Sequence, residues 1–153
     1  MNPYEERQTE RDTMVQDQIA GRGVRDTHVL AAMRRIPRHA FIPPHTDAAS
    51  RAYADGAQPI GEGQTISQPY IVALMTESLA LTGTETVLEI GAGSGYQTAL
   101  LAALAARVIA IERHAPLAER AGRALGTLGL SANVRLLVGD GSRGWAADAP
   151  YDA

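Results

Sequence analysis

In the second half of the chain, short apolar runs alternate with longer segments of helical periodicity. The apolar runs are residues 86–90, 108–112 and 134–138, and the helical segments between them are residues 96–106 and 116–126. Buried parallel strands are near-continuous apolar runs, and strands that alternate with helices form parallel sheets through right-handed crossovers. The pattern therefore predicts a parallel βαβαβ unit and an α/β fold.

The first half of the chain has a different pattern. Residues 5–20 carry a partial apolar stripe that ends at Gly21 and Gly23, which predicts an amphipathic helix stopped by glycine. Asp26 is a favourable N-cap for a second helix, which Pro37 ends. The fold therefore begins with N-terminal helices that precede the βαβαβ unit.

Between these helices and the βαβαβ unit the periodicity is lost and then returns. Residues 38–64 contain repeated prolines and glycines, which predicts loops and short hairpin strands. A long irregular segment in a small domain is more often functional than not. Ser67 stands at a typical N-cap position, with Pro69 in the first turn of a helix expected to continue to Gly83.

Composition narrows the possible chemistry. The 153 residues suffice for one domain, and 45% hydrophobic with 20% charged residues is typical of a globular protein. Lysine and cysteine are absent, which excludes Schiff bases, a P-loop lysine, disulfides and cysteine metal sites. The four histidines lack metal-ligand spacing, so no metal is expected. The net charge of −3 argues against nucleic acid as a partner. No apolar stretch is long enough to span a membrane and no secretory signal is present, so a cytoplasmic location is expected.

A glycine-rich turn follows the first apolar run, from Glu89 to Gly95, and reads E-I-G-A-G-S-G. Glycines allow a tight turn and the close approach of a ligand to the backbone, and the following helix offers free N–H groups to an anion. Dinucleotide sites have the spacing G-x-G-x-x-G, whereas these glycines occur at alternate positions. Glu112 ends the next apolar run, where a carboxylate can accept both hydroxyls of a ribose. The alternative for Glu112 is a solvated residue at a strand end.

The E-x-G-x-G-x-G pattern resembles motif I of class I S-adenosylmethionine methyltransferases. Asp140-Gly141 fits the same class, in which an acidic residue after the third strand typically faces the adenine amino group, although alone it would indicate a plain turn. Residues 63–70, G-Q-T-I-S-Q-P-Y, are more specific and resemble the signature of the protein-L-isoaspartate O-methyltransferase family. The similarity extends over nearly the whole chain, and His39, where glutamate is usual, is a minor difference.

This resemblance implies transfer of a methyl group from S-adenosylmethionine to the α-carboxylate of L-isoaspartyl residues in damaged proteins. Because that carboxylate is already ionised, the enzyme needs no general base and mainly aligns the reacting atoms. Ser67 matches the family's active-site serine, which would hydrogen-bond the incoming carboxylate; a helix cap is an equally good role and does not exclude the first. The residues implied to bind the cofactor are Ile66, Glu89, Gly91, Gly93, Gly95, Glu112, Arg113, Asp140 and Gly141.

Two other functions remain open: a class I methyltransferase with a different acceptor, and a cofactor-binding fragment without activity. The expected division is residues 1–68 as N-terminal helices and substrate-side loops and residues 69–153 as an incomplete Rossmann-like unit that binds S-adenosylmethionine, together one domain. The chain ends at Tyr151-Asp152-Ala153, where a fourth strand should begin beside residues 86–90. An open central strand is expected to leave a marginal fold with little activity. The complete protein is expected to be a monomer, with no nucleic-acid or membrane partner.

Overall fold

The computed structural model describes residues 2–153, and its contacts divide the chain between Ala80 and Leu81. We call Met1–Ala80 the N-terminal unit and Leu81–Ala153 the C-terminal unit. The expected division at residues 68 and 69 separates substrate-side from cofactor-side functions, and in that sense it stays a prediction.

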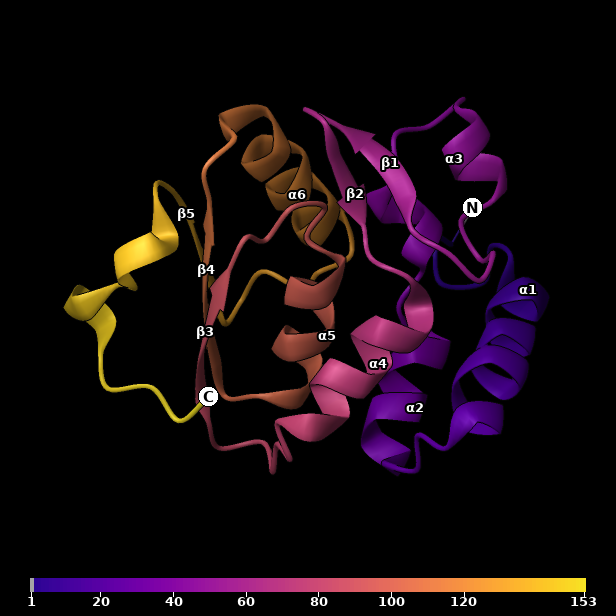
Figure 1. Cartoon of the computed structure of the whole chain (residues 1–153), viewed down its shortest axis with the longest axis horizontal. Helices are drawn as coiled ribbons and strands as arrows, with labels where there is room; N and C mark the ends of the chain where they lie inside the picture. The colour runs from indigo at the N-terminus through magenta and orange to yellow at the C-terminus, as the bar shows by residue number, and fades with distance from the viewer. Residues whose placement is uncertain (1) are drawn as a thin grey trace. The chain divides into compact units, whose positions relative to one another are not determined.

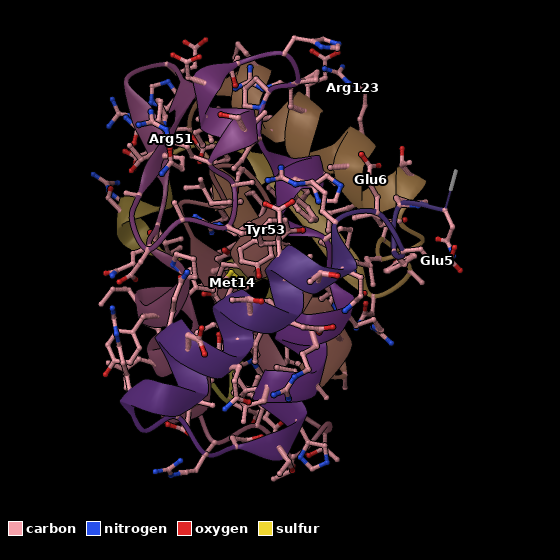
Figure 2. The ribbon with its side chains drawn as sticks, turned by 90° about the vertical axis from the view of Figure 1, so that its right-hand side faces the viewer. Glu5, Glu6, Met14, Arg51, Tyr53 and Arg123 are labelled. Atoms are coloured by element: carbon pink, nitrogen blue, oxygen red, sulfur yellow. The ribbon has the colours of Figure 1, made fainter. Side chains whose placement is uncertain are left out.

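The N-terminal unit begins with one continuous helical segment of three geometries. Helix α1 (Gln8–Thr13) continues as a π-helix (Met14–Ile19) and a 3₁₀ turn (Ala20–Arg22), and it ends at Gly23 with φ 104°. The predicted glycine stop is confirmed, because this φ favours glycine. The π-helical turns were not predicted. They bury Met14 (labelled in Figure 2), together with Val15 and Ile19.

Helix α2 (Thr27–Arg35) begins at the predicted cap. The Asp26 carboxylate accepts hydrogen bonds from the backbone N–H groups of His28, at 2.8 Å, and Val29, at 3.0 Å. These bonds satisfy two of the amides that a helix N-terminus leaves without an internal partner. The helix ends just before Pro37, as predicted, since the residue before a proline disfavours helical geometry.

The irregular segment contains more helix than predicted and also the predicted hairpin. A 3₁₀ turn (Arg38–Phe41) and the short α3 (Asp47–Ser50) precede the antiparallel strands β1 (Gln58–Gly61) and β2 (Gln64–Ile66). Thr46 caps α3 by accepting a bond from the Ala49 amide at 3.1 Å. The two helical segments have only four residues each, which is too short for a periodic apolar pattern to show in the sequence.

Helix α4 (Pro69–Ser78) begins one residue later than the predicted cap implies. Gln68 is the N-cap, with ψ 137°, and Pro69 occupies the first helical position. The proline ring disfavours helical geometry in the preceding residue, so the boundary falls at Gln68. The predicted capping role of Ser67 is therefore wrong. The helix also ends at Ser78, before Gly83.

The C-terminal unit is built on the predicted parallel sheet. Strands β3 (Thr86–Ile90), β4 (Arg107–Glu112) and β5 (Val134–Val138) pair in the order β3-β4-β5 (Figure 1). The middle strand is buried along its length after its first residue, as its continuous apolar run predicts.

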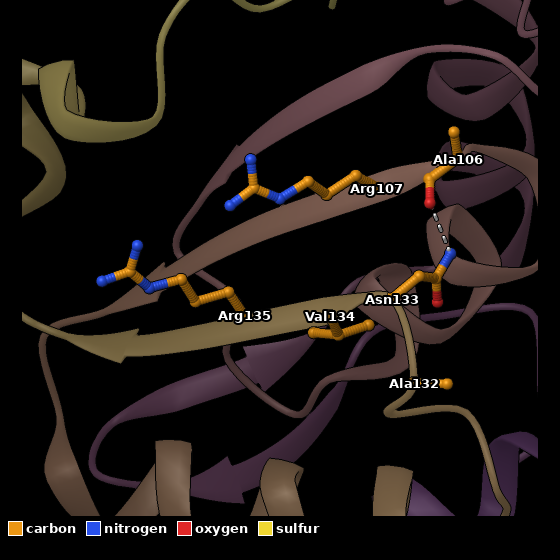
Figure 3. A pocket seen from close by; sticks show the side chains of 6 residues that line it. All are labelled: Ala106, Arg107, Ala132, Asn133, Val134 and Arg135. Carbon is orange, nitrogen blue, oxygen red and sulfur yellow. Dashed lines mark hydrogen bonds between the residues drawn. The ribbon is translucent and has the colours of Figure 1, made fainter.

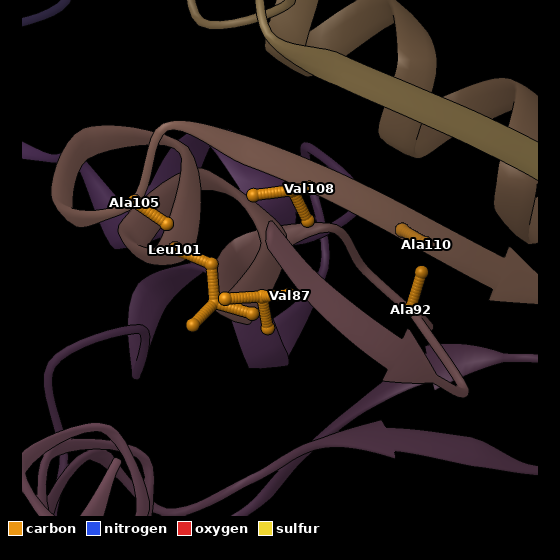
Figure 4. Packing of buried hydrophobic residues seen from close by; sticks show 6 residues of the cluster. All are labelled: Val87, Ala92, Leu101, Ala105, Val108 and Ala110. Carbon is orange, nitrogen blue, oxygen red and sulfur yellow. The ribbon is translucent and has the colours of Figure 1, made fainter. Parts of the chain in front are cut away.

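Two helices cover one face of this sheet. They are α5 (Tyr96–Leu104) and α6 (Ala115–Thr127), and the segment after β5 lies on the opposite face (Figure 1). The two predicted helices and the α/β class are thereby confirmed. Figure 4 shows the apolar cluster that joins α5 to the sheet, which consists of Val87, Ala92, Leu101, Ala105, Val108 and Ala110.

The last residues of the chain lie along the other edge of β3. The Asp152 amide donates to the Thr86 carbonyl at 2.9 Å, and the Leu88 amide donates to the Ala153 carbonyl at the same distance. This is the position predicted for the start of a fourth strand. The marginal stability and the low activity expected of the chain both stay predictions.

A buried carboxylate fixes the segment after β5 to the sheet. Asp148 forms ion pairs with Arg107, at 2.5 Å, and Arg135, at 2.6 Å, and accepts a hydrogen bond from the Trp145 indole at 2.8 Å. The two arginines extend from neighbouring strands in the same direction and line a surface pocket with Ala106, Ala132, Asn133 and Val134 (Figure 3).

Within residues 2–153, no helix is both long and apolar enough to cross a membrane.

Candidate functional site

Three predicted site segments meet at the carboxyl edge of the parallel sheet. Each follows a strand: the glycine loop follows β3, Glu112 ends β4, and Asp140 follows β5. The loop amides of Gly91 and Ala92 both donate to the Ile111 carbonyl, at 2.8 and 3.0 Å. The Gly139 amide donates to the Glu112 carbonyl at 3.0 Å. The carboxyl edge is where ligands bind in open α/β sheets.

The glycine loop requires glycine for two separate reasons. Gly91, Gly93 and Gly95 have φ of 84°, 56° and 86°, a region that other residues rarely adopt. A Cβ at Gly95 would also lie only 2.8 Å from the Cβ of Ala121 in α6. The loop therefore turns tightly and packs closely against a helix, and at the N-terminus of α5 the Tyr96 amide donates to the Ser94 hydroxyl at 3.2 Å.

Glu112 ties the glycine loop to the end of β4. Its carboxylate is 4% exposed and accepts the Gly93 amide on Oε2 and the His114 amide on Oε1, both at 2.8 Å. The alternative of a solvated strand-end residue is therefore wrong. Each carboxylate oxygen has a second lone pair, so Glu112 can accept further hydroxyl groups while it holds the loop.

Glu89 is a second buried carboxyl group at this edge. Its Oε2 accepts the Thr98 hydroxyl at 2.6 Å. Burial, with repulsion from Glu112, raises the pKa of Glu89 to about 7, although the Thr98 hydrogen bond acts in the opposite direction. Two neighbouring buried carboxyl groups favour a cationic ligand over an anionic one. The sequence did not predict the contact of Thr98 with Glu89. The available signal was the position of Thr98 on the first turn of α5, directly after the glycine loop.

Asp140 and Gly141 form a turn at the third strand end. The Asp140 carboxylate accepts the Ser142 amide at 2.9 Å, which lowers its pKa, and the positive charge of Arg113 lowers the pKa further. A Cβ at Gly141 would lie 2.8 Å from the side chain of Ile90, so this turn lies against the end of β3. Asp140 therefore does stabilise a turn, which is the structural role that the sequence also allowed for it. Its role in binding stays a prediction, as does that of Arg113.

Ile66 and Ser67 belong to the N-terminal unit. Ile66 is buried at the end of β2 and pairs with Gln58 of β1. The exposed Ser67 follows it, and within residues 2–153 no hydrogen bond engages the Ser67 hydroxyl. Because that hydroxyl does not cap α4, it is available to a ligand.

Two residues beside Ser67 have contacts that sequence analysis missed. The Gln68 amide donates to the Asp55 carboxylate at 2.7 Å, and the Arg22 guanidinium lies 5.4 Å from the centre of the Tyr70 ring. No local pattern predicts these contacts, because each joins segments that are far apart in the sequence.

The parallel sheet, the alternate-glycine loop and the carboxylate at the second strand end define the Rossmann-like fold of class I methyltransferases. A family model described as Protein-L-isoaspartate(D-aspartate) O-methyltransferase (PCMT) matches residues 9–153. The chain belongs to this family.

Individual relatives agree with this assignment. A protein-L-isoaspartate O-methyltransferase of Methylorubrum populi is 57% identical over 94% of this chain and 66% of its own length. A solved protein-L-isoaspartate O-methyltransferase superposes with a TM-score of 0.78 at 30% identity, over 92% of this chain and 45% of the solved one. A Plasmodium falciparum structure described as a putative member in complex with S-adenosyl-L-homocysteine shares the fold, with a TM-score of 0.67 at 20% identity, over 84% of this chain and 62% of its own. The chain thus spans about two thirds, or less, of these relatives.

Proposed function

We propose that the chain carries the cofactor-binding and acceptor-positioning parts of a protein-L-isoaspartate O-methyltransferase. The observation that carries the proposal is the glycine loop bonded to the buried Glu112 at the carboxyl edge of the sheet. Membership of the family and the availability of the Ser67 hydroxyl support the choice of reaction. The substrate class is damaged proteins and peptides that contain L-isoaspartyl residues.

S-adenosylmethionine is the proposed cofactor, and the chemistry of the edge fits it. Glu112 would accept the ribose hydroxyls, and the glycine loop with the N-terminus of α5 would receive the methionine carboxylate. The two buried carboxyl groups of Glu89 and Glu112 suit a positively charged sulfonium and disfavour the pyrophosphate of a dinucleotide. The further residues proposed to contact the cofactor are Ile66, Arg113, Asp140 and Gly141.

The proposed reaction requires alignment more than acid–base catalysis. When bound, the cofactor supplies a methyl group on a sulfonium, which the acceptor carboxylate displaces to give a methyl ester and a neutral sulfide. That carboxylate is ionised at neutral pH, so no side chain has to remove a proton. Ser67 can donate a hydrogen bond to the acceptor carboxylate and hold one oxygen in line for attack.

Ser67→Ala is expected to lower kcat for an isoaspartyl peptide by about 10-fold or more, because a hydrogen bond to a charged group contributes about 1.5–3 kcal/mol. The affinity for S-adenosylhomocysteine should stay within about two-fold, since the lost contact is to the acceptor. Methyl-transfer kinetics and calorimetry measure the two effects.

The matched control is Ser78→Ala. Ser78 is an exposed serine of the same unit, and its hydroxyl donates to the Leu74 carbonyl within α4. This variant should leave both quantities unchanged. An unchanged kcat in Ser67→Ala would remove the proposed role of Ser67.

A further inference from the structure

The segment around Ser67 is held on its C-terminal side by two contacts from distant residues. Gln68, the next residue, donates from its side-chain amide to Asp55 at 2.7 Å. Tyr70 carries the Arg22 guanidinium over its ring, at 5.4 Å from the ring centre. A guanidinium on the face of a tyrosine ring is an attractive cation–π contact. Ile66, on the other side, is fixed by burial in the hairpin.

Asp55 and Arg22, which contact Gln68 and Tyr70, are also bonded to each other. Arg22 reaches Asp55 through both terminal nitrogens, one to each carboxylate oxygen, with the Nη1–Oδ1 distance at 3.2 Å. The pKa of Asp55 is lowered first by the Gln68 hydrogen bond and then by the Arg22 contact, so the carboxylate stays ionised at neutral pH. Arg22, Asp55, Gln68 and Tyr70 therefore form one connected network, which we call the Ser67 brace.

The brace is anchored in the core of the N-terminal unit. Three residues before Asp55, the Ala52 carbonyl accepts a bond from Arg38 Nε at 2.7 Å. The carbonyl of Tyr53 (labelled in Figure 2) accepts the Gln18 amide at 2.9 Å, and its hydroxyl is 3.2 Å from Arg11 Nη1. Ala52 and Tyr53 are both buried. The loop that carries Asp55 is consequently held in place by the side chains of Arg38, Gln18 and Arg11.

We propose that Arg22 and Asp55 are positioning residues that hold the Ser67 segment in the conformation that receives the methyl acceptor. This inference rests on the proposed function for its kinetic consequences. An exposed ion pair contributes little to global stability. Here, however, the Asp55 carboxylate also accepts a hydrogen bond from Gln68, and the Arg22 guanidinium also lies over the Tyr70 ring. The ion pair therefore contacts two residues that closely follow Ser67. Loss of the brace should therefore loosen this segment more than it destabilises the fold.

Asp55→Ala is expected to raise the KM for an isoaspartyl peptide by about 3- to 10-fold, the range set by one or two surface hydrogen bonds. The KM for S-adenosylmethionine should change by less than about two-fold. Gln68→Ala should give a similar change, and the double variant should be no worse than either single one, because both remove the same link. Asp55→Glu should restore part of the peptide KM.

The matched control is Glu119→Ala, which removes an exposed ion pair with Arg123 on α6, in the C-terminal unit. It should leave both KM values unchanged. Additive effects of Asp55→Ala and Gln68→Ala, or equal changes in both KM values, would overturn the inference.

Amide hydrogen exchange provides a readout that does not depend on activity. Asp55→Ala should speed exchange in residues 65–72, while the free energy of unfolding in urea stays close to that of the unmodified chain. Unchanged exchange there would refute the brace. An unmodified chain that transfers no methyl group would instead count against the proposed function and leave the exchange result to decide the brace.

Discussion

Glu112→Gln is expected to weaken the binding of S-adenosylhomocysteine by at least about 10-fold, because charge-assisted hydrogen bonds contribute about 1.5–3 kcal/mol. The structure adds a second reason. Both carboxylate oxygens accept backbone amides, from Gly93 and His114. A glutamine has one oxygen, so one of these amides would lose its acceptor and the glycine loop would lose its attachment to β4 or the next helix. Calorimetry measures the affinity, and urea unfolding measures the accompanying loss of stability.

The control for Glu112→Gln is Glu119→Gln, which removes the same charge from an exposed position on α6, where Glu119 pairs with Arg123. This variant should bind S-adenosylhomocysteine as the unmodified chain does. Equal affinity in Glu112→Gln, or tight binding of NAD by the unmodified chain, would contradict the role assigned to the sheet edge.

Glu89 should make the free energy of unfolding fall as the pH rises from about 4.5 to 7. The pKa of this buried carboxyl is raised from 4.5 to about 7, so in this window the folded chain keeps a proton that the unfolded chain has lost. The stabilisation is complete below pH 4.5 and is lost as the pH rises through 7. The difference in pKa corresponds to about 3 kcal/mol. Glu89→Gln keeps an acceptor for Thr98 and should remove this slope.

The test is the difference between the urea-unfolding profiles of Glu89→Gln and the unmodified chain. This difference cancels other titrations, such as that of His39. Burial is the main cause that lowers the pKa of His39, so this residue should make the folded chain less stable as the pH falls below the ordinary value of 6.5. Glu85→Gln is the contrasting control. The pKa of Glu85 is lowered to about 2 by hydrogen bonds from Thr82, so its stabilisation should be lost only as the pH falls from 4.5 towards 2. A flat difference profile would show that Glu89 titrates normally.

The same carboxyl links protonation to cofactor binding. A bound sulfonium near Glu89 should favour its ionised form, so binding of S-adenosylmethionine near pH 7 should release protons. The heat of binding should then depend on the ionisation enthalpy of the buffer in the unmodified chain, and this dependence should be smaller in Glu89→Gln.

The sequence predicted the framework of the C-terminal unit well because its signals are local. The apolar run at residues 134–138 and the turn glycines at Gly91 to Gly95 each determine structure within a few residues. The cap at Asp26 was predicted for the same reason, since its partners are two and three residues away.

What the sequence did not predict depends on contacts between distant residues or on competition between neighbours. The Asp55–Gln68 and Arg22–Tyr70 contacts join separate segments, so no local pattern indicates them. Ser67 has good capping chemistry, but Pro69 moves the helix boundary to Gln68. The raised pKa of Glu89 depends on its burial and on Glu112, which lies on another strand.

The most direct test of the account is methyl transfer from labelled S-adenosylmethionine to an L-isoaspartyl peptide, measured beside the otherwise identical L-aspartyl peptide. Even at the low rate expected of it, the unmodified chain should esterify the isoaspartyl peptide and leave the aspartyl peptide almost unlabelled, and Glu112→Gln should reduce the labelling further. Equal labelling of both peptides, or labelling of neither while S-adenosylmethionine binds, would contradict the proposal that this chain acts on isoaspartyl carboxylates.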